Sequence, residues 1–414
     1  MIVLSLQSGT SADGIDVAVV ECSPLASDRA SERRPDRPAL GLRVLHASTL
    51  EWDAGLRERI LAVSAGEPLT AGQVCELDTR LGQAFADAAV AALEASGAVP
   101  ELVVSHGQTL FHWVDGGHAR GTLQLGEPAW IAERIGAPVL SHVRAADIAA
   151  GGEGAPLMAI FDRLWLGSDA AASGRALGTV NLGGIANVQL VRPDGEVVAF
   201  DSGPGNGLID AVVARATGGA PAYDDGGRLA ASGGVHEPLL EELLRHPYFA
   251  APAPKSTGRE TFDLGVVDRA VAASGAESLT LQDLAATLTE LTARTVVDAI
   301  PAADPPSVLV VSGGGALNPV LLGRLTAAAA SRGIAVESSA GRGIDPAFKE
   351  SLMFALLGFL SWHGVPARLS SGGTGEPRVA GRFTSGRMPL QLPPPLAGVA
   401  SVTITSTDPG GPLR

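Results

Sequence analysis

A carboxylate followed by closely spaced glycines is the feature of this sequence best suited to chemistry. Asp201 follows the apolar run Val197–Phe200, and the next residues, Ser202–Gly207, include three glycines. Ligands of open α/β sheets collect at the carboxyl ends of strands. A carboxylate placed there could act as a general base or hold Mg²⁺ through water. The alternative role is the N-cap of a helix that starts near Leu208.

The N-terminal segment Ser8–Asp16 is a second candidate site, rich in Gly, Ser, Thr and Asp. It lies between apolar runs at Ile2–Leu6 and Ile15–Val20, which predicts a β-hairpin. The sequence has no Gly-Lys-Ser/Thr run of the kind that opens a P-loop helix. A hairpin tip can still direct backbone N–H groups and hydroxyls at a phosphate chain. An ordinary hairpin turn is the alternative.

Three further turns combine small and polar residues. Asn181–Asn187 encloses Gly183-Gly184, and its two asparagines, expected to be buried, need a ligand or backbone partner. Ser312–Gly315 is a triple-glycine turn followed by Asn318, and it could let a base or ribose approach the backbone. Lys255–Glu260 contains two cations and two hydroxyls that could contact phosphate or a substrate carboxylate. An exposed surface loop is the alternative for this last segment.

Regular elements must position these motifs. Apolar residues recur at helical spacing in several long segments, and short β-branched runs alternate with glycine turns. We expect helices at 54–64, 70–97, 127–136, 281–300, 319–330 and 346–362, and strands at 102–104, 138–141, 178–182, 185–191, 197–200 and 308–311.

The strand–turn–strand pattern occurs twice, near residues 2–20 and again near 178–200. This repetition predicts a duplicated α/β fold with one nucleotide cleft between two halves. A chain of 414 residues is long enough for two domains. We place an N-terminal domain at 1–143, joined by about 365–385, and a second domain at 144–364. Residues 24–41 are expected to form an exposed insertion, and residues 386–414 a disordered tail.

Composition excludes several classes of protein. The formal net charge of −14 argues against a nucleic-acid-binding surface. Two cysteines cannot build a disulfide framework, and the apolar runs are too short to span a membrane. Together with an N-terminus that does not resemble a signal peptide, these features favour the cytoplasm. His106 and His112 lack further ligand-like neighbours, so no protein metal centre is expected.

With these motifs in order, the chain resembles the anhydro-N-acetylmuramic acid kinases from about residue 2 to about residue 382. The motifs that carry the resemblance are Ser8–Ser11 with Asp13–Asp16, Ser105–Thr109, Arg144–Ala149, Gly151–Leu157, Asn181–Asn187, Phe200–Asn206, His246–Phe249, Pro254–Glu260, Ala286–Thr292, Gly313–Gly315 with Asn318-Pro319, and Lys349-Glu350.

The resemblance implies a duplicated, ribonuclease-H-like fold of the actin/hexokinase type and an ATP- and Mg²⁺-dependent kinase. Such a kinase opens the 1,6-anhydro ring of its sugar with water while phosphorylating O6, in cell-wall recycling. The resemblance also implies a homodimer. It assigns Asp201 as the catalytic base. The implied sugar contacts are His106, Gln108, Arg144, Asp147 and Glu350. The implied ATP contacts are Gly9, Thr10, Ser11, Ala12, Asp13, Gly14, Ile15, Asp16, Asn181, Gly183, Gly184, Gly203, Pro204, Gly205, Asn206, Gly313, Gly314, Gly315 and Asn318.

Four positions depart from the family pattern: Gln7, Ala12, Glu153 and Ser202 replace the usual Met, Leu, Gln and Thr. Glu153 adds a possible charge to a loop that could meet an anionic sugar substituent. A kinase of another 1,6-anhydro sugar, such as levoglucosan, is therefore the alternative enzyme. A non-catalytic sugar or nucleotide sensor on the same scaffold is the alternative from another class, and it would have no need to keep Asp201.

Overall fold

The computed structural model describes residues 1–9, 11–25, 36–258, 261–369 and 376–405. The chain divides into two compact units, Met1–Trp165 with Phe348–Arg414, and Leu166–Ala347. These boundaries differ from the expected ones near residues 143 and 364. The reason is packing: helix α14 (Lys349–Trp362) lies against strands of the first unit, so it belongs with that sheet.

The first unit is built on a sheet of eight strands in the described part of the chain. Its order is β12-β6-β4-β1-β2-β3-β13, with β5 paired to β4 outside this path. Strands β1, β2 and β3 are antiparallel neighbours, while β4 and β6 continue the sheet in parallel to β1. The strands are β1 (Ile2–Ser8), β2 (Ile15–Pro24), β3 (Ala39–Leu50), β4 (Leu102–Asp115), β5 (His118–Leu125), β6 (Val139–Ser141), β12 (Arg382–Thr384) and β13 (Ser401–Ile404).

The second unit has a five-stranded sheet in the order β11-β10-β7-β8-β9. Strands β7, β8 and β9 are antiparallel neighbours, and β10 and β11 continue in parallel to β7. The strands are β7 (Leu177–Leu182), β8 (Ile185–Val191), β9 (Val197–Pro204), β10 (Val308–Ser312) and β11 (Ala335–Ser338).

The two sheets share one topology. In the first unit, β3-β2-β1-β4-β6 has the same order and strand directions as β9-β8-β7-β10-β11 in the second. The expected duplicated, ribonuclease-H-like α/β fold is therefore confirmed. In both units the first two strands form the hairpin that the sequence predicted.

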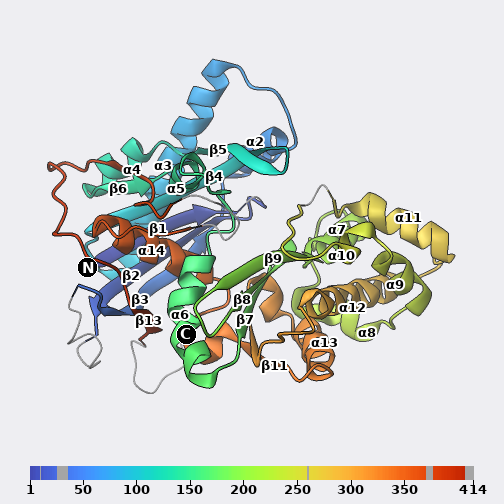
Figure 1. Ribbon diagram of the computed structural model, residues 1–414. Coiled ribbons are helices and arrows are strands. Elements are labelled where there is room, and N and C mark those ends of the chain that lie inside the picture. The colour runs from blue at the N-terminus through green and yellow to red at the C-terminus, as the bar shows by residue number, and fades with distance from the viewer. Residues whose placement is uncertain (10, 26–35, 259–260, 370–375, 406–414) are drawn as a thin grey trace. The chain divides into compact units, whose positions relative to one another are not determined.

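Helices cover both faces of the first sheet (Figure 1). On one face, Phe85 and Leu81 of α3 join Leu4 and Leu6 of β1 in the core. On the other face α14 approaches closely, since a Cβ on Gly358 would lie 2.5 Å from Val104 Cγ2. The helices are α2 (Ala54–Ser64), α3 (Ala71–Ser96), α4 (Pro128–Ile135), α5 (Val143–Ala149), α14, and α6 (Ala159–Ser173), which continues into the second unit.

The second unit has two apolar clusters. One lies between the sheet and helices α12 and α13, and the other joins α7, α9, α11 and α12. Helix α12 contributes to both clusters, so it is the central support of this unit. Its helical elements are α7 (Gly207–Thr217), η1 (Asp225–Gly227), α8 (Arg228–Ser232), α9 (Glu237–Leu244), α10 (Pro247–Ala250), α11 (Leu264–Ser274), α12 (Leu281–Ala299), η2 (Gly314–Leu317), α13 (Pro319–Ala330) and η3 (Ser339–Arg342).

The expectation of a disordered tail over 386–414 is wrong for its described part. Ser401–Ile404 form β13, which pairs in parallel with β3 from Ala39 to Leu42. Backbone hydrogen bonds to a distant strand compensate for the Gly- and Pro-rich composition of this segment. Residues 406–414 and most of the expected insertion, residues 26–35, lie outside the described residues.

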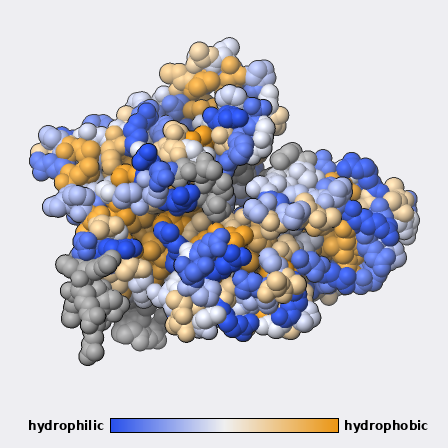
Figure 2. Space-filling model, in the orientation of Figure 1, coloured by the Kyte–Doolittle hydropathy of each residue, from blue (hydrophilic) through white to orange (hydrophobic). Residues whose placement is uncertain are grey.

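Hydrophilic and hydrophobic residues are interspersed over the visible surface of each unit (Figure 2). Among the helices that the structure describes, none combines the length and apolar character needed to cross a membrane.

Candidate active site

Asp201 lies in β9 with both carboxylate oxygens engaged. Asn187 Nδ2 on the neighbouring strand donates to Oδ1 at 2.7 Å, and the Thr257 backbone N–H donates to Oδ2 at 2.9 Å. Burial raises the pKa of Asp201, while these two hydrogen bonds oppose the shift. A carboxylate with a raised pKa is a stronger base, and two donors fix its orientation. Asp201 does not cap α7, whose N-cap is Asn206, so its carboxylate is not used to start that helix.

A second layer of contacts supports the backbone of Asp201. The Tyr248 hydroxyl donates to the Asp201 carbonyl at 2.7 Å, and the Asp201 N–H donates to the Lys255 carbonyl at 2.8 Å. Lys255 Nζ donates to the Tyr248 carbonyl at 2.9 Å and lies 4.5 Å from the Tyr248 ring centroid. The Lys255 ammonium therefore has partners within its own unit. Arg259 and Glu260 of the same motif lie outside the described residues.

The glycine turns after β7 and β9 meet in the second unit. Asn206 N–H donates to the Gly183 carbonyl at 2.7 Å, and Gly205 N–H donates to the Gly184 carbonyl at 3.0 Å. A Cβ on Gly205 would overlap the Gly183 carbonyl oxygen, so only glycine fits this approach. The expected ATP-side residues Gly183, Gly184, Gly203, Pro204, Gly205 and Asn206 are thus one cluster.

The triple-glycine turn after β10 joins this cluster. A Cβ on Gly315 would lie 2.6 Å from Leu182 Cβ and 2.7 Å from Asn206 Oδ1. A Cβ on Gly313 would lie 2.5 Å from Asn181 Oδ1. Gly314, between Gly313 and Gly315 in the sequence, is exposed. Asn181 was expected to be buried but is exposed, because it lies near the carboxyl end of β7, beside the glycine turn. Three segments far apart in sequence thus present backbone at one place.

Asn318 has a structural role that the sequence left open. Its Oδ1 accepts from the backbone N–H groups of Val320 and Leu321 at 3.0 and 3.1 Å, so it is the N-cap of α13. Its carbonyl oxygen is therefore used within the fold.

The N-terminal loop in the first unit is held by side chains from outside the hairpin. Trp52 Nε1 donates to Ser8 Oγ at 3.2 Å, and Arg57 Nε donates to the Ala12 carbonyl at 2.9 Å. Ala12 has a positive φ of 52° and is fully buried. The other expected ATP contacts in this loop differ in exposure. Gly9 and Asp13 are exposed, Ser11 and Asp16 are half-buried, and Gly14 and Ile15 are buried. Thr10 lies outside the described residues.

Arg144 and His106 are in direct contact in the first unit. Arg144 Nε donates to His106 Nε2 at 3.1 Å, and the imidazole stacks on Phe354 of α14 with ring centroids 4.8 Å apart. Burial, with the Arg144 charge as a second cause, lowers the pKa of His106 well below its usual value. The ring is therefore neutral, accepts at Nε2 and carries its proton on Nδ1.

Two carboxylates accompany Arg144. Asp147, one turn further along α5, accepts from the Gly154 N–H at 2.8 Å through Oδ2. Glu350 lies at the start of α14; burial raises its pKa, the Arg144 charge opposes that shift, and Asp16 adds to it. The expected sugar contacts Arg144, Asp147 and Glu350 are therefore brought near one another in one unit.

Gln108 and its surroundings carry unused hydrogen-bonding capacity. Gln108 Nε2 donates to the Gly9 carbonyl at 3.1 Å, which ties the end of β4 to the N-terminal loop. Gln108 Oε1, Gln7 Oε1 and Ser105 Oγ are buried and have no hydrogen-bond partner among the described residues. Buried polar atoms of this kind require partners, so these groups are suited to a polar ligand.

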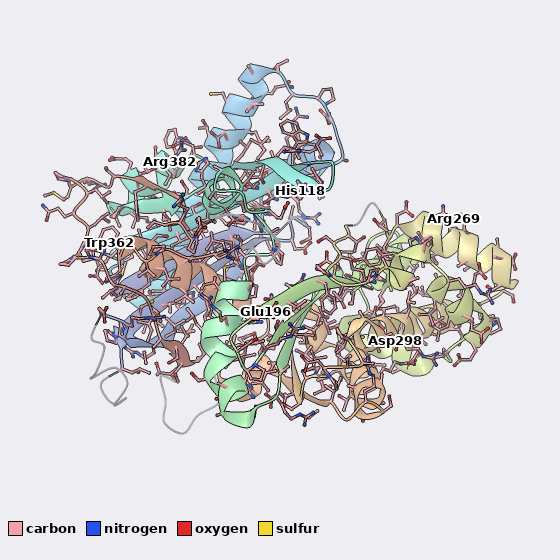
Figure 3. All side chains as sticks on the ribbon, in the orientation of Figure 1. His118, Glu196, Arg269, Asp298, Trp362 and Arg382 are labelled. Carbon is pink, nitrogen blue, oxygen red and sulfur yellow. The ribbon has the colours of Figure 1, made fainter. Side chains whose placement is uncertain are left out.

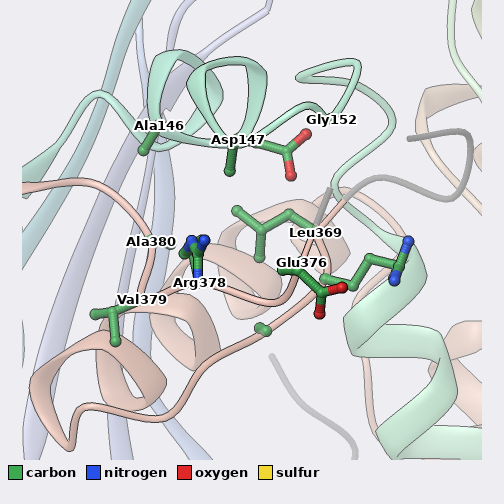
Figure 4. Close-up of a pocket in the computed structure, with 11 residues that line it drawn as sticks. Ala146, Asp147, Gly152, Leu369, Glu376, Arg378, Val379 and Ala380 are labelled. Carbon is green, nitrogen blue, oxygen red and sulfur yellow. The ribbon is translucent and has the colours of Figure 1, made fainter. Parts of the chain in front are cut away.

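A small pocket with charged lining residues lies beside Asp147 of α5 (Figure 4). Asp147 and Gly152 form one wall, and Leu369, Glu376 and Arg378 face them from the C-terminal part of the first unit (Figure 4). No group of three or more His, Cys, Asp or Glu side chains in the described ranges is arranged to hold a metal ion.

Some residues around Asp201 were missed as site residues. Asn187, Tyr248 and Thr257 contact Asp201, yet none of these contacts was expected from sequence. The available signal was their membership in the motifs Asn181–Asn187, His246–Phe249 and Lys255–Glu260.

The repeated strand order and the clustered glycine turns define a duplicated α/β protein of the actin/hexokinase-like class. Residues 1–384 match the model of the family described as anhydro-N-acetylmuramic acid kinase. The chain belongs to this family.

Curated relatives with the same description include the protein of Streptomyces avermitilis, 47% identical over 95% of this chain and 97% of its own length. The protein of Xanthomonas campestris pv. campestris is 42% identical over 91% of this chain and 96% of its own. Among solved structures, an activator of 2-hydroxyisocaproyl-CoA dehydratase from Clostridium difficile with bound ADPNP is similar, with a TM-score of 0.41, 11% identity, and coverage of 87% of this chain and 94% of its own.

Proposed function

We propose that the protein is an ATP-dependent kinase of 1,6-anhydro-N-acetylmuramic acid that yields N-acetylmuramic acid 6-phosphate and ADP in cell-wall recycling. Membership in the family over residues 1–384 is the observation that carries this proposal. The positioned base Asp201, the glycine cluster and the Arg144 group support it.

Asp201 is proposed as the general base for ring opening. It takes a proton from a water whose oxygen attacks C1, and the C1–O6 bond breaks. O6 then attacks the γ-phosphorus of ATP, whose bond to the bridging oxygen breaks so that ADP leaves. The Asn187 and Thr257 hydrogen bonds hold the carboxylate in a fixed orientation, and its raised pKa favours proton uptake. General-base catalysis typically contributes about 10²–10⁴-fold in rate.

The Arg144 group is proposed to bind the sugar. Arg144 is a cation suited to a carboxylate substituent, and its Nε contact with neutral His106 orients it. Glu350 and Asp147 are acceptors for sugar hydroxyls, and Gln108 Oε1 is a further acceptor with no partner among the described residues.

The glycine loops are proposed to bind ATP through backbone N–H groups, together with the Gly9–Asp16 loop. Oxygen donors such as Asp13, Asp16 and the Ser11 hydroxyl fit Mg²⁺, which prefers oxygen ligands and retains several waters. Bound Mg²⁺ would neutralise charge on the phosphates.

We also propose a cytoplasmic homodimer. Phe111 and Leu123 pair across β4 and β5 and, with Trp113, leave large apolar side chains 43–62% exposed. Exposed apolar surface of this kind is typical of protein interfaces. Light scattering after gel filtration, with Phe111→Ser as the comparison, tests the dimer.

Coupled ADP release with MgATP tests the activity, with 1,6-anhydro-N-acetylmuramic acid, levoglucosan and N-acetylmuramic acid measured in parallel. Turnover with the first sugar alone supports the proposal. Turnover with levoglucosan alone would instead support the alternative kinase, and ATP binding without turnover on any sugar would support a sensor.

A further inference from the structure

Glu153 connects two parts of the first unit that flank the proposed sugar site. It lies in the loop after α5, and its carboxylate reaches the hairpin of β4 and β5. Ala119 N–H donates to Oε2 at 2.7 Å, and His118 Nδ1 lies 3.0 Å from Oε1. The Glu153 side chain is 25% exposed, whereas His118 is 68% exposed at the end of the hairpin (Figure 3).

The carboxylate of Glu153 is charged in this setting. Its hydrogen bonds from His118 and Ala119 lower its pKa. His112 of β4 also makes a hydrogen bond to the Glu153 backbone. Charge-assisted hydrogen bonds are shorter and stronger than neutral ones, so this loop residue is held by both strands of the hairpin.

The next residue, Gly154, is held from the opposite side by α5. Arg144 Nη1 donates to the Gly154 carbonyl at 2.8 Å, and Asp147 Oδ2 accepts from the Gly154 N–H at 2.8 Å. Both side chains belong to the proposed sugar site. The backbone of one residue, Gly154, therefore orients both Arg144 and Asp147, and its own position depends on the neighbouring Glu153.

We infer that Glu153 is a positioning residue that fixes the sugar-binding side chains by anchoring the Gly151–Gly154 loop to the hairpin of β4 and β5. The anchored loop keeps the Gly154 carbonyl in place, and that carbonyl together with His106 restricts the Arg144 guanidinium. The identity of the sugar in this inference rests on the proposed function, whereas the anchoring of the loop by Glu153 does not.

The test compares three variants of the full-length protein. Glu153→Ala removes both contacts, while Glu153→Gln keeps an oxygen that can accept from Ala119 N–H. Glu196→Ala is the matched control, because Glu196 forms an exposed ion pair with Arg192 in the turn between β8 and β9 of the other unit (Figure 3). The readouts are steady-state kinetics and hydrogen–deuterium exchange of peptides covering 150–157.

In Glu153→Ala we expect KM for the anhydro sugar to rise about tenfold, as for the loss of one net hydrogen bond of about 1.4 kcal/mol. KM for ATP and kcat should stay within about twofold, and exchange in 150–157 should accelerate. In Glu153→Gln the KM for the anhydro sugar and the exchange in 150–157 should return most of the way to wild-type values, and Glu196→Ala should match wild type.

The inference would be overturned if Glu153→Ala showed the same KM for the anhydro sugar and the same exchange as Glu196→Ala. It would also be overturned if Glu153→Gln were as impaired as Glu153→Ala. Wild-type protein without turnover on the anhydro sugar would refute the proposed function alone. The exchange comparison would then still decide the role of Glu153.

Discussion

Arg144 Nε donates to His106 Nε2 at 3.1 Å, although both side chains are basic. The contact is possible because burial and the Arg144 charge lower the pKa of His106, so the imidazole is a neutral acceptor. A protonated ring would lose this acceptor and place two cations side by side.

This relationship predicts a pH-dependent stability. The unfolded imidazole binds a proton below its usual pKa of 6.5, whereas the folded one does not until much lower pH. The stabilisation from keeping this ring neutral is therefore complete above pH 6.5 and is lost progressively as pH falls below it, by roughly 1 kcal/mol at pH 5.5. His106→Gln keeps an acceptor but does not titrate. Urea unfolding at pH 7.5 and 5.5 should show a smaller decrease for this variant than for wild type, and equal decreases would contradict the assignment.

Asp201→Asn should reduce kcat by at least about 10²-fold because the base is lost. The side-chain NH₂ of the new asparagine would also face another donor, either Asn187 Nδ2 or the Thr257 N–H, so one of these hydrogen bonds would be lost. Binding of a non-hydrolysable ATP analogue, measured by calorimetry, should be retained. Asp298→Asn, an exposed change on α12 (Figure 3), is the control. Loss of nucleotide binding in Asp201→Asn would indicate a structural or metal-binding role instead.

The raised pKa of Asp201 predicts the acid limb of the pH–rate profile. The base works when deprotonated, so kcat/KM should fall as pH decreases through a pKa above the usual 3.8 of an aspartate. Asn187→Ala removes a hydrogen bond that lowers this pKa, so the acid limb should move to higher pH. An unchanged limb in Asn187→Ala would exclude Asp201 as its source.

Lys349 and Asp162 form a buried ion pair with 2.7 Å between Nζ and Oδ1 and exposures of 5% and 0%. Lys349→Met leaves Asp162 charged and buried, and should lower the free energy of unfolding by about 3–5 kcal/mol. Denaturant unfolding measures the effect. The double variant Lys349→Met/Asp162→Leu should lose much less than the sum of the single variants; additive losses would mean that the two side chains do not interact.

Gly205→Ala should disturb the proposed ATP loops, because its Cβ would overlap the Gly183 carbonyl oxygen. We expect at least about tenfold weaker ATP binding. Gly323→Ala is the control, since a Cβ there meets nothing within 4 Å on α13. That control should keep ATP affinity and gain about 0.5–1 kcal/mol of stability. Equal ATP affinity in both variants would argue against a role for the Gly205 turn.

The sequence alone determined the local elements. Hydrophobic spacing predicted α2 and β8 with their observed bounds, and α12 to within one residue, because a helix or strand needs one apolar face with a fixed period. The two strand–turn–strand patterns indicated the duplication, since each hairpin is encoded within about 20 residues.

Only the tertiary structure decided which distant residues meet. Thr257 contacts Asp201 across 56 positions in the sequence, and Glu153 reaches Ala119 across 34. The tail residues Ser401–Ile404 form a strand because they pair with the edge of β3, a partner that the local sequence does not reveal. Local periodicity reports which face of an element is buried. Pairing between elements depends on register and packing over the whole unit. For that reason Asp201 could be singled out from sequence as a candidate base, while the groups that hold its carboxylate could not.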